Sequence, residues 1–103
     1  MLRPLIAPIL ERKGARRAIL FGSHARGTAD RRSDIDLIIV DDEPLRYLDR
    51  LTKYFDELSA ALPVAVDLFV YTTAELVDLA SRHFVRRALA EGQVVYERRE
   101  AGS

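Results

Sequence analysis

Residues 19 to 40 read ILFGSHARGTADRRSDIDLIIV, and this stretch decides the fold that we expect for the whole chain. It predicts a strand ending at Phe21, a Gly-Ser turn, a polar segment, and a second strand over Ile35–Val40 that two aspartates introduce. Alternate residues on a strand project from the same face, so Asp34 and Asp36 should direct two carboxylates at one point. Carboxylates held this close repel unless a cation lies between them or one takes up a proton. The first option predicts a site for a hard cation such as magnesium or manganese.

The residues outside this stretch supply helices and two further strands. Gly or Pro marks most boundaries between segments of helical spacing and short apolar runs. The predicted elements are a helix up to Lys13, a strand over 17–21, a short helix within 24–28, a strand over 35–40, a helix over 44–62, a strand over 64–71, a helix from Thr72 or Thr73 to Gly92, and a strand over 93–97. This alternation predicts an α/β or α+β fold, with helices packed on a small sheet of about four strands.

The helix expected over 44–62 has the clearest pattern in the chain. Pro44 suits its first turn, and Pro63 ends it. Its apolar positions form one stripe, which we expect to face the core. The stripe consists of Leu45, Leu48, Leu51, Phe55, Leu58 and Leu62. The acidic run before the helix, Asp41 to Glu43, is expected to form a solvated loop.

Asp67 interrupts an otherwise apolar run over 64–71, which predicts a strand buried on both faces. An ionised carboxylate in such a strand costs several kcal/mol unless it is paired or binds a metal. If this strand lies beside the Asp34 and Asp36 strand, three carboxylates converge and can hold two divalent ions together with a polyphosphate. The alternative is that Asp67 lies on an edge strand and faces water.

The Gly22-Ser23 turn predicts a phosphate site beside these carboxylates. Glycine lets the backbone approach a ligand closely, and free amides, the Ser23 hydroxyl and a helix start can receive a phosphate. Ser23 can also cap that helix. Arg26 suits either a phosphate contact or a surface ion pair, and His24 is expected to be a surface residue rather than a general base. The combined chemistry is nucleotidyl transfer: a hydroxyl attacks the α-phosphate of a nucleoside triphosphate, and pyrophosphate leaves.

Composition narrows the class of protein. The chain has 103 residues and a formal net charge of zero, so we expect one domain over 1–103 with a frayed tail at 98–103, and no direct nucleic-acid binding. It has no cysteine, which excludes disulfides and zinc-thiolate sites. The absence of a signal peptide and of an apolar run of about 20 residues predicts a cytoplasmic protein without membrane contact.

Five features resemble the minimal nucleotidyltransferases, a branch of the DNA polymerase β-like superfamily. They are Gly-Ser at 22–23, Ala-Arg-Gly at 25–27, Ser-Asp-Ile-Asp-Leu at 33–37, Asp67 in a later apolar strand, and the closing AEGQVVYE at 90–97. The resemblance implies a polymerase β palm-like fold with a mixed sheet, two magnesium ions (or manganese) and ATP as the donor. It also implies the antitoxin role of pairs in which AMP is transferred to a tyrosine of a HEPN ribonuclease toxin.

The resemblance assigns a role to each of five residues. Asp34 and Asp36 would hold both metals, Asp67 would bind the catalytic metal and accept the proton of the attacking hydroxyl, and Gly22 and Ser23 would hold the triphosphate. Two alternatives stay open: a binding module that neutralises its partner without catalysis, and a transferase to a small molecule such as an aminoglycoside. A homo-oligomer and a hetero-oligomer with a HEPN dimer are both compatible with the sequence.

Overall fold

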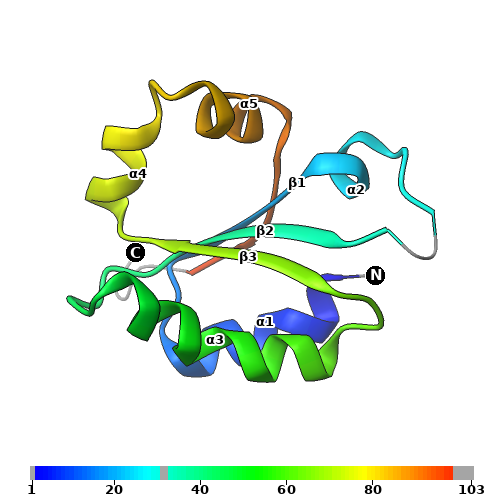
Figure 1. Cartoon of the computed structure of the whole chain (residues 1–103). Coiled ribbons are helices and arrows are strands. Elements are labelled where there is room, and N and C mark those ends of the chain that lie inside the picture. Colours follow the sequence, from blue (N-terminus) through cyan, green and yellow to red (C-terminus); the bar gives the residue numbers. More distant parts are fainter. Residues whose placement is uncertain (1, 31–32, 99–103) are drawn as a thin grey trace.

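The expected strands form one sheet with helices on both faces (Figure 1). The computed structural model describes residues 2–30 and 33–98. In chain order the elements are α1 (Arg3–Lys13), β1 (Arg17–Phe21), α2 (Gly22–Arg26), β2 (Ile35–Val40), α3 (Tyr47–Ala61), β3 (Val66–Tyr71), α4 (Thr73–Leu79), α5 (His83–Glu91) and β4 (Gln93–Glu97). None of the helices in these two ranges combines the length and the apolar character needed to span a membrane.

The sheet is mixed, with the strand order β3-β2-β1-β4. Strand β1 pairs antiparallel with β2 and β4, whereas β2 and β3 run parallel. Phe21, the last residue of β1, lies opposite Asp36, and Asp36 in turn lies opposite Asp67 on β3. The sheet register therefore brings the end of the first strand and the beginnings of the next two to one place.

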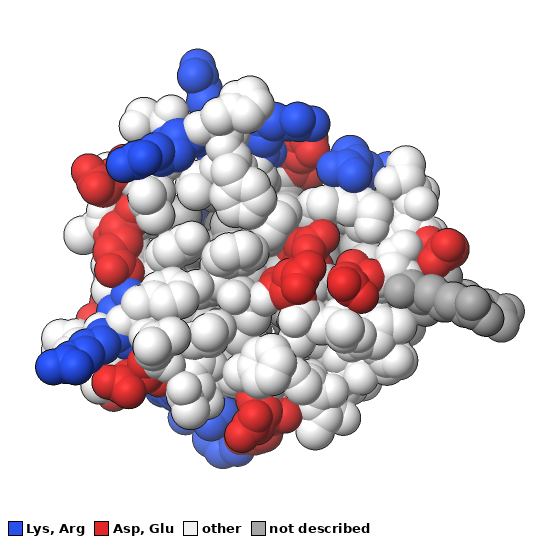
Figure 2. Space-filling model, in the orientation of Figure 1, with Lys and Arg blue, Asp and Glu red and all other residues white. Residues whose placement is uncertain are grey.

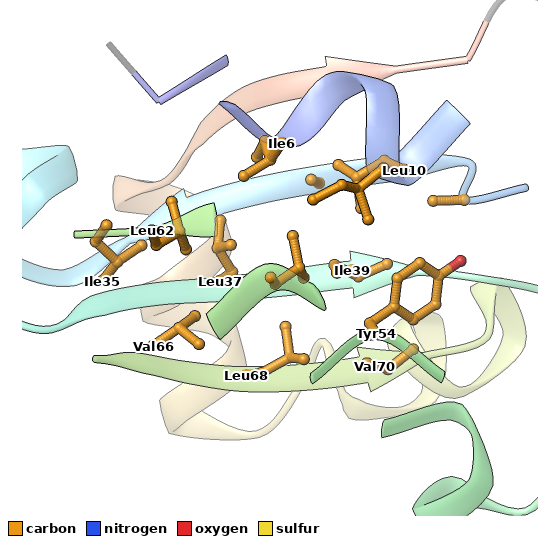
Figure 3. Packing of buried hydrophobic residues seen from close by; sticks show 14 of the residues in the cluster. Ile6, Leu10, Ile35, Leu37, Ile39, Tyr54, Leu62, Val66, Leu68 and Val70 are labelled. Carbon is orange, nitrogen blue, oxygen red and sulfur yellow. The ribbon is translucent and has the colours of Figure 1, made fainter. Parts of the chain in front are cut away.

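Strand β2 is central, and its residues from Leu37 to Val40 are buried on both faces, which explains why the strand is apolar after Asp36. Leu37 and Ile39 face the layer of α1 and α3, where they pack with Ile6, Leu10 and other apolar residues (Figure 3). The neighbouring residues 38 and 40 face α4 and α5 and belong to a second cluster. Asp36 precedes that second series by two residues, so its side chain lies on the α4 and α5 face.

The sequence predicts the helix ends after β3 correctly but not the break between them. Thr72 accepts a hydrogen bond from the Glu75 N–H, and the Glu75 side chain accepts one from the Thr72 N–H, so a capping box begins α4. The single helix expected up to Gly92 is two helices, because Arg82 adopts an extended backbone. At the end of the chain, Arg98 donates its N–H to Arg16, whereas the rest of the expected frayed tail lies outside the described residues.

The apolar stripe predicted for α3 is partly wrong. The helix begins at Tyr47 rather than at Pro44, and Leu48 is 71% exposed while Phe55 is also exposed. Arg50 and Tyr54 take inner positions instead, since both have long side chains that find polar partners when buried. The Arg50 guanidinium donates to the Leu45 and Val70 carbonyls and to Glu75, and the Tyr54 hydroxyl donates to Asp41.

Asp41 was expected in a solvated loop, and this prediction is wrong. The residue is only 2% exposed and accepts hydrogen bonds from the Tyr54 hydroxyl, the Glu43 N–H and Lys53 Nζ, the last at 2.8 Å. Burial alone would raise the pKa of Asp41, but the hydrogen bonds from Lys53 and Tyr54 outweigh it and lower this pKa. Asp41 is therefore a structural residue that fixes α3 to the end of β2.

Candidate functional site

The site is built around two carboxylates that face each other across neighbouring strands. Asp36 on β2 and Asp67 on β3 are register partners in a parallel pair, so their side chains project from the same face of the sheet. The two carboxyl groups are close enough for Asp67 to raise the pKa of Asp36. Strand β3 is an edge strand whose outward residues are partly or fully exposed, so the expectation of burial on both faces is wrong. Asp67 is exposed, in line with the edge-strand alternative.

The negative charges of the two carboxylates repel each other. Burial, the hydrogen bond to Asp67 and the negative charges of Asp67 and Asp34 raise the pKa of Asp36, and His24 opposes them weakly. A raised pKa means that the folded protein disfavours the ionised carboxylate at this position. Binding of a proton or a cation relieves this cost.

Asp34 lies one residue before β2 and is exposed. Its charge reaches Asp36, as the pKa of Asp36 records. However, across residues 2–30 and 33–98 no group of three or more His, Asp or Glu side chains is arranged so that it could hold a metal ion. The structure thus brings Asp36 and Asp67 together as a pair, with Asp34 as a neighbouring charge.

Gly22 is packed so closely against Asp36 that no side chain fits there. A Cβ added to Gly22 would lie 2.2 Å from Asp36 Oδ2, far inside van der Waals contact, and its φ of +71° is one that other residues rarely adopt. Glycine at this position lets the turn after β1 lie directly on the carboxylate pair. The Gly-Ser turn and the aspartates are therefore parts of one site.

Ser23 lies in the first turn of α2 but does not cap it. Phe21 is the N-cap, and no side chain caps this helix, so the capping prediction is wrong. Within the described part of the chain, the Ser23 hydroxyl makes no hydrogen bond, while its carbonyl accepts one from the Thr28 N–H. The Ser23 hydroxyl is thus available to a ligand.

The neighbouring basic residues make protein contacts. His24 Nε2 lies 3.0 Å from the Ser33 carbonyl, so this half-buried ring fastens the loop before β2 rather than standing free. Arg26 Nη1 lies 3.2 Å from Glu91 Oε2 on α5. Of the two alternatives for Arg26, the structure contains the surface ion pair, and a phosphate contact stays a prediction.

Two adjoining hollows open beside the carboxylate pair. One, of about 330 Å³, is lined by Phe21, Gly22, Arg26, His83, Phe84, Arg87, Ala88 and Glu91. The other, of about 260 Å³, is lined by Phe21, Asp36, Asp67, Leu68, Phe69 and Phe84. Phe84 is 50% exposed, lines both hollows, and has its ring 5.5 Å from that of Phe69.

Phe84, Phe69 and Arg87 are residues of the site region that the sequence pattern did not single out. Phe84 has the spacing of a core residue on α5, and Phe69 belongs to an apolar run, so both resemble ordinary packing positions. Phe69 follows Asp67 by two residues on the same face of β3, whereas the position of α5 brings Phe84 and Arg87 to the hollows. Figure 2 shows acidic side chains gathered over the beginnings of β2 and β3, with Lys and Arg side chains over α5 and α2.

Comparison with known proteins gives a family match and two clear relatives. The model of the polymerase beta nucleotidyltransferase family matches residues 5–101. The chain is 46% identical over 55 residues to the probable protein adenylyltransferase MntA of Haemophilus influenzae, covering 52% of this chain and 46% of that one. It is 38% identical over 68 residues to a Methanocaldococcus jannaschii protein that is also named as a protein adenylyltransferase, covering 66% and 72%. The chain thus spans less than half of the Haemophilus relative.

Solved structures confirm the fold. A toxin–antitoxin structure with AMP-PNP superposes with a TM-score of 0.68 at 24% identity, covering 96% of this chain and 76% of that one. A tri-AMPylated Shewanella oneidensis HEPN toxin in complex with its MNT antitoxin gives a TM-score of 0.57 at 20% identity, covering 95% and 74%. The four-stranded mixed sheet with its flanking helices is therefore an arrangement that these proteins share.

Proposed function

Because this chain belongs to the polymerase beta nucleotidyltransferase family, we propose that it transfers AMP from ATP to a hydroxyl group of a partner protein. The observation that carries the proposal is the facing pair Asp36 and Asp67, with Gly22 packed against it. A protein that used this face only for binding would gain nothing from placing a second carboxylate beside Asp36, whose pKa is raised by burial and by that neighbour.

The residues suit magnesium, or manganese in its place. Oxygen donors are the ligands that both ions prefer, and the closeness of Gly22 to Asp36 keeps side-chain atoms away from that carboxylate. Asp36 and Asp67 would hold two ions together with Asp34, and the triphosphate would complete the ligand sets, since the chain alone offers a pair rather than a cage. The bound ions would neutralise charge on the triphosphate and lower the pKa of the attacking hydroxyl.

Side chains and backbone of this chain would bind the triphosphate and accept the proton of the attacking hydroxyl. The Ser23 hydroxyl donates to a phosphate oxygen, the backbone at Gly22 allows the triphosphate to approach, and Arg26 offers its guanidinium to the same phosphates. The acceptor oxygen forms a bond to the α-phosphorus, and the bond from that phosphorus to the β-bridging oxygen breaks. Pyrophosphate leaves with the bond's electron pair, and the hydroxyl proton passes to Asp67.

The acceptor that suits the second hollow is a tyrosine. Four of the six residues that line it are apolar or aromatic, and the two others are the facing carboxylates. A phenol ring can pack against Phe69 and Phe84 while its hydroxyl points to Asp67. A serine hydroxyl would leave this apolar surface uncovered, so the lining favours an aromatic acceptor.

The partner that we propose is a HEPN ribonuclease toxin, with this protein as the antitoxin. Relatives named as protein adenylyltransferases and the fold shared with an MNT antitoxin bound to an AMPylated HEPN toxin support this role. AMP on the toxin would silence it by adding a bulky, negatively charged group to its surface.

The test is transfer of label from α-³²P-ATP to a HEPN toxin encoded by a gene next to that of this chain, with magnesium present and then removed by a chelator. We expect label on a toxin tyrosine, identified by mass spectrometry, and loss of toxin activity. Absence of label would overturn the enzyme assignment for this pair. Rescue of toxin-expressing cells by the Asp36→Asn variant as well as by the wild type would instead favour the binding-module alternative.

A further inference from the structure

Glu91, the last residue of α5, contacts two arginines at the rim of the hollow beside Gly22. Its Oε2 lies 3.2 Å from Arg26 Nη1, and its Oε1 lies 3.4 Å from Arg87 Nη2. All three side chains line the hollow of about 330 Å³ that adjoins the carboxylate pair. One carboxylate thus pairs with both arginines that line this hollow.

The position of Glu91 is fixed by its neighbour Gly92. A Cβ added to Gly92 would lie 2.6 Å from Ile19 Cγ2 and 2.5 Å from the Ala88 carbonyl, so only glycine allows α5 to end this close to β1. Val85 and Ala88 anchor the inner side of the helix in the core. The end of α5 is therefore held beside the hollow, with the Glu91 side chain partly exposed.

The two ion pairs are weak enough to exchange. The side chain of Arg26 is 47% exposed, that of Arg87 is 63% exposed, and that of Glu91 is 35% exposed. Ion pairs at such exposure contribute little to stability. A triphosphate offers several charged oxygens in the fork geometry that guanidinium groups bind best, against the two oxygens of one carboxylate.

We propose that Glu91 is an exchangeable counter-ion, which holds Arg26 and Arg87 in place until the triphosphate displaces it, and that Arg87 is a second arginine of the donor site. The inference rests on the proposed function, because it assigns the triphosphate to this hollow. Glu91 and Arg87 act on the affinity for the donor, and the reacting atoms lie at Asp36 and Asp67.

The experiment measures binding of inorganic tripolyphosphate and of ATP by calorimetry, in magnesium and without any partner protein. Glu91→Gln removes the competing charge, so we expect the Kd for both probes to fall about threefold to tenfold. Arg87→Gln should raise both values about tenfold. The control is Arg86→Gln on the same helix, outside the lining of the hollow, and its Kd should stay within about twofold of the wild type.

The direction of the Glu91→Gln effect separates exchange from a structural role. If Glu91 only supports the fold, its removal leaves the Kd unchanged or raises it. Either result overturns the inference. Failure of every variant to bind tripolyphosphate would also overturn it. Thermal unfolding of each variant shows whether the fold is intact. Unchanged Kd values in a protein that still transfers AMP would overturn this inference alone, whereas the expected Kd changes without any transfer would overturn the proposed function alone.

Discussion

The two ends of β2 carry similar acidic sequences and have opposite environments. At its beginning, Asp36 faces the carboxylate of Asp67, and its pKa is raised by burial and by that neighbour. At its end, Asp41 is more deeply buried, yet hydrogen bonds from Lys53 and Tyr54 lower its pKa. The structure satisfies one aspartate completely and leaves the other opposed by like charge.

This difference distinguishes a carboxylate whose partners belong to the protein from one that needs a ligand to balance its charge. A buried charge is tolerated when its partners come from the protein itself, as at Asp41. Where the protein instead adds a second carboxylate, the compensating charge has to come from outside the chain. Burial alone would have selected Asp41 as the unusual aspartate, whereas the identity of the partners selects Asp36.

The largest effect is expected from Asp36→Asn. The amide removes a cation ligand and the like charge that opposes Asp67, so AMP transfer should fall by at least about 100-fold while stability stays equal or rises. Labelled-ATP transfer and urea unfolding measure the two properties separately.

The matched control for that variant is Asp42→Asn at the other end of the strand. Asp42 contacts Arg16 and the start of α4, far from the hollows, so transfer should stay within about twofold of the wild type. Equal losses of transfer in the two variants would contradict the distinction between the ends of β2.

Asp41→Ala should cost the most stability. Lys53 and the Tyr54 hydroxyl would lose a buried partner, and we expect the free energy of unfolding to drop by about 3 kcal/mol. Asp42→Ala, at an exposed position, should cost about 1 kcal/mol or less. Urea denaturation followed by circular dichroism compares them, and a smaller loss for Asp41 than for Asp42 would refute the structural role.

Tyr54→Phe removes only one of the hydrogen bonds to Asp41. The variant keeps the fully buried ring and removes one hydroxyl donor to Asp41, so we expect a loss of about 1–2 kcal/mol. Burial and the hydrogen bond to Asp41 raise the pKa of Tyr54 far above its usual range, so its hydroxyl stays protonated at any working pH. A neutral effect on unfolding would show that Lys53 and the Glu43 N–H satisfy Asp41 without the Tyr54 hydroxyl.

The smallest effect that we expect is the pH dependence of the stability that Asp41 contributes. The pKa of Asp41 is lowered in the folded protein, so its contribution is present above the ordinary aspartate pKa of about 3.9 and is lost as the pH falls through the lowered value. The groups that face it are Lys53, Tyr54 and Glu43. The stability difference between the wild type and Asp41→Asn should therefore shrink from pH 7 to pH 3, and a constant difference would contradict this.

Strand positions in this protein follow closely from the sequence. Strand β2 is apolar apart from Asp36 and lies between polar segments, and its predicted limits, Ile35–Val40, are those observed. The Gly-Ser turn precedes both aspartates in the chain, and it lies beside Asp36 because the antiparallel pairing of β1 and β2 places Phe21 opposite Asp36. The pairing of Asp36 with Asp67 needed one further condition, that β3 lies beside β2, and the structure meets it.

What the sequence did not predict depends on contacts between distant elements. Periodicity defines an apolar stripe on α3 but not that Arg50 and Tyr54 would point inward, since their partners Glu75 and Asp41 lie elsewhere in the chain. The same holds for Phe84 and Arg87, whose place at the hollows depends on how α5 crosses the sheet. Side-chain partners across elements are the information that a pattern along one element does not contain.

The pairing of Asp36 and Asp67 makes the proposed activity depend on the correct register of the sheet. The two carboxylates meet only because β2 and β3 pair in one register, and a slip of a single residue would turn Asp67 to the opposite face of the sheet. Strand β3 is at the edge, where local opening costs less than global unfolding. A misregistered or frayed molecule would therefore lack the facing carboxylates on which the proposed transfer depends.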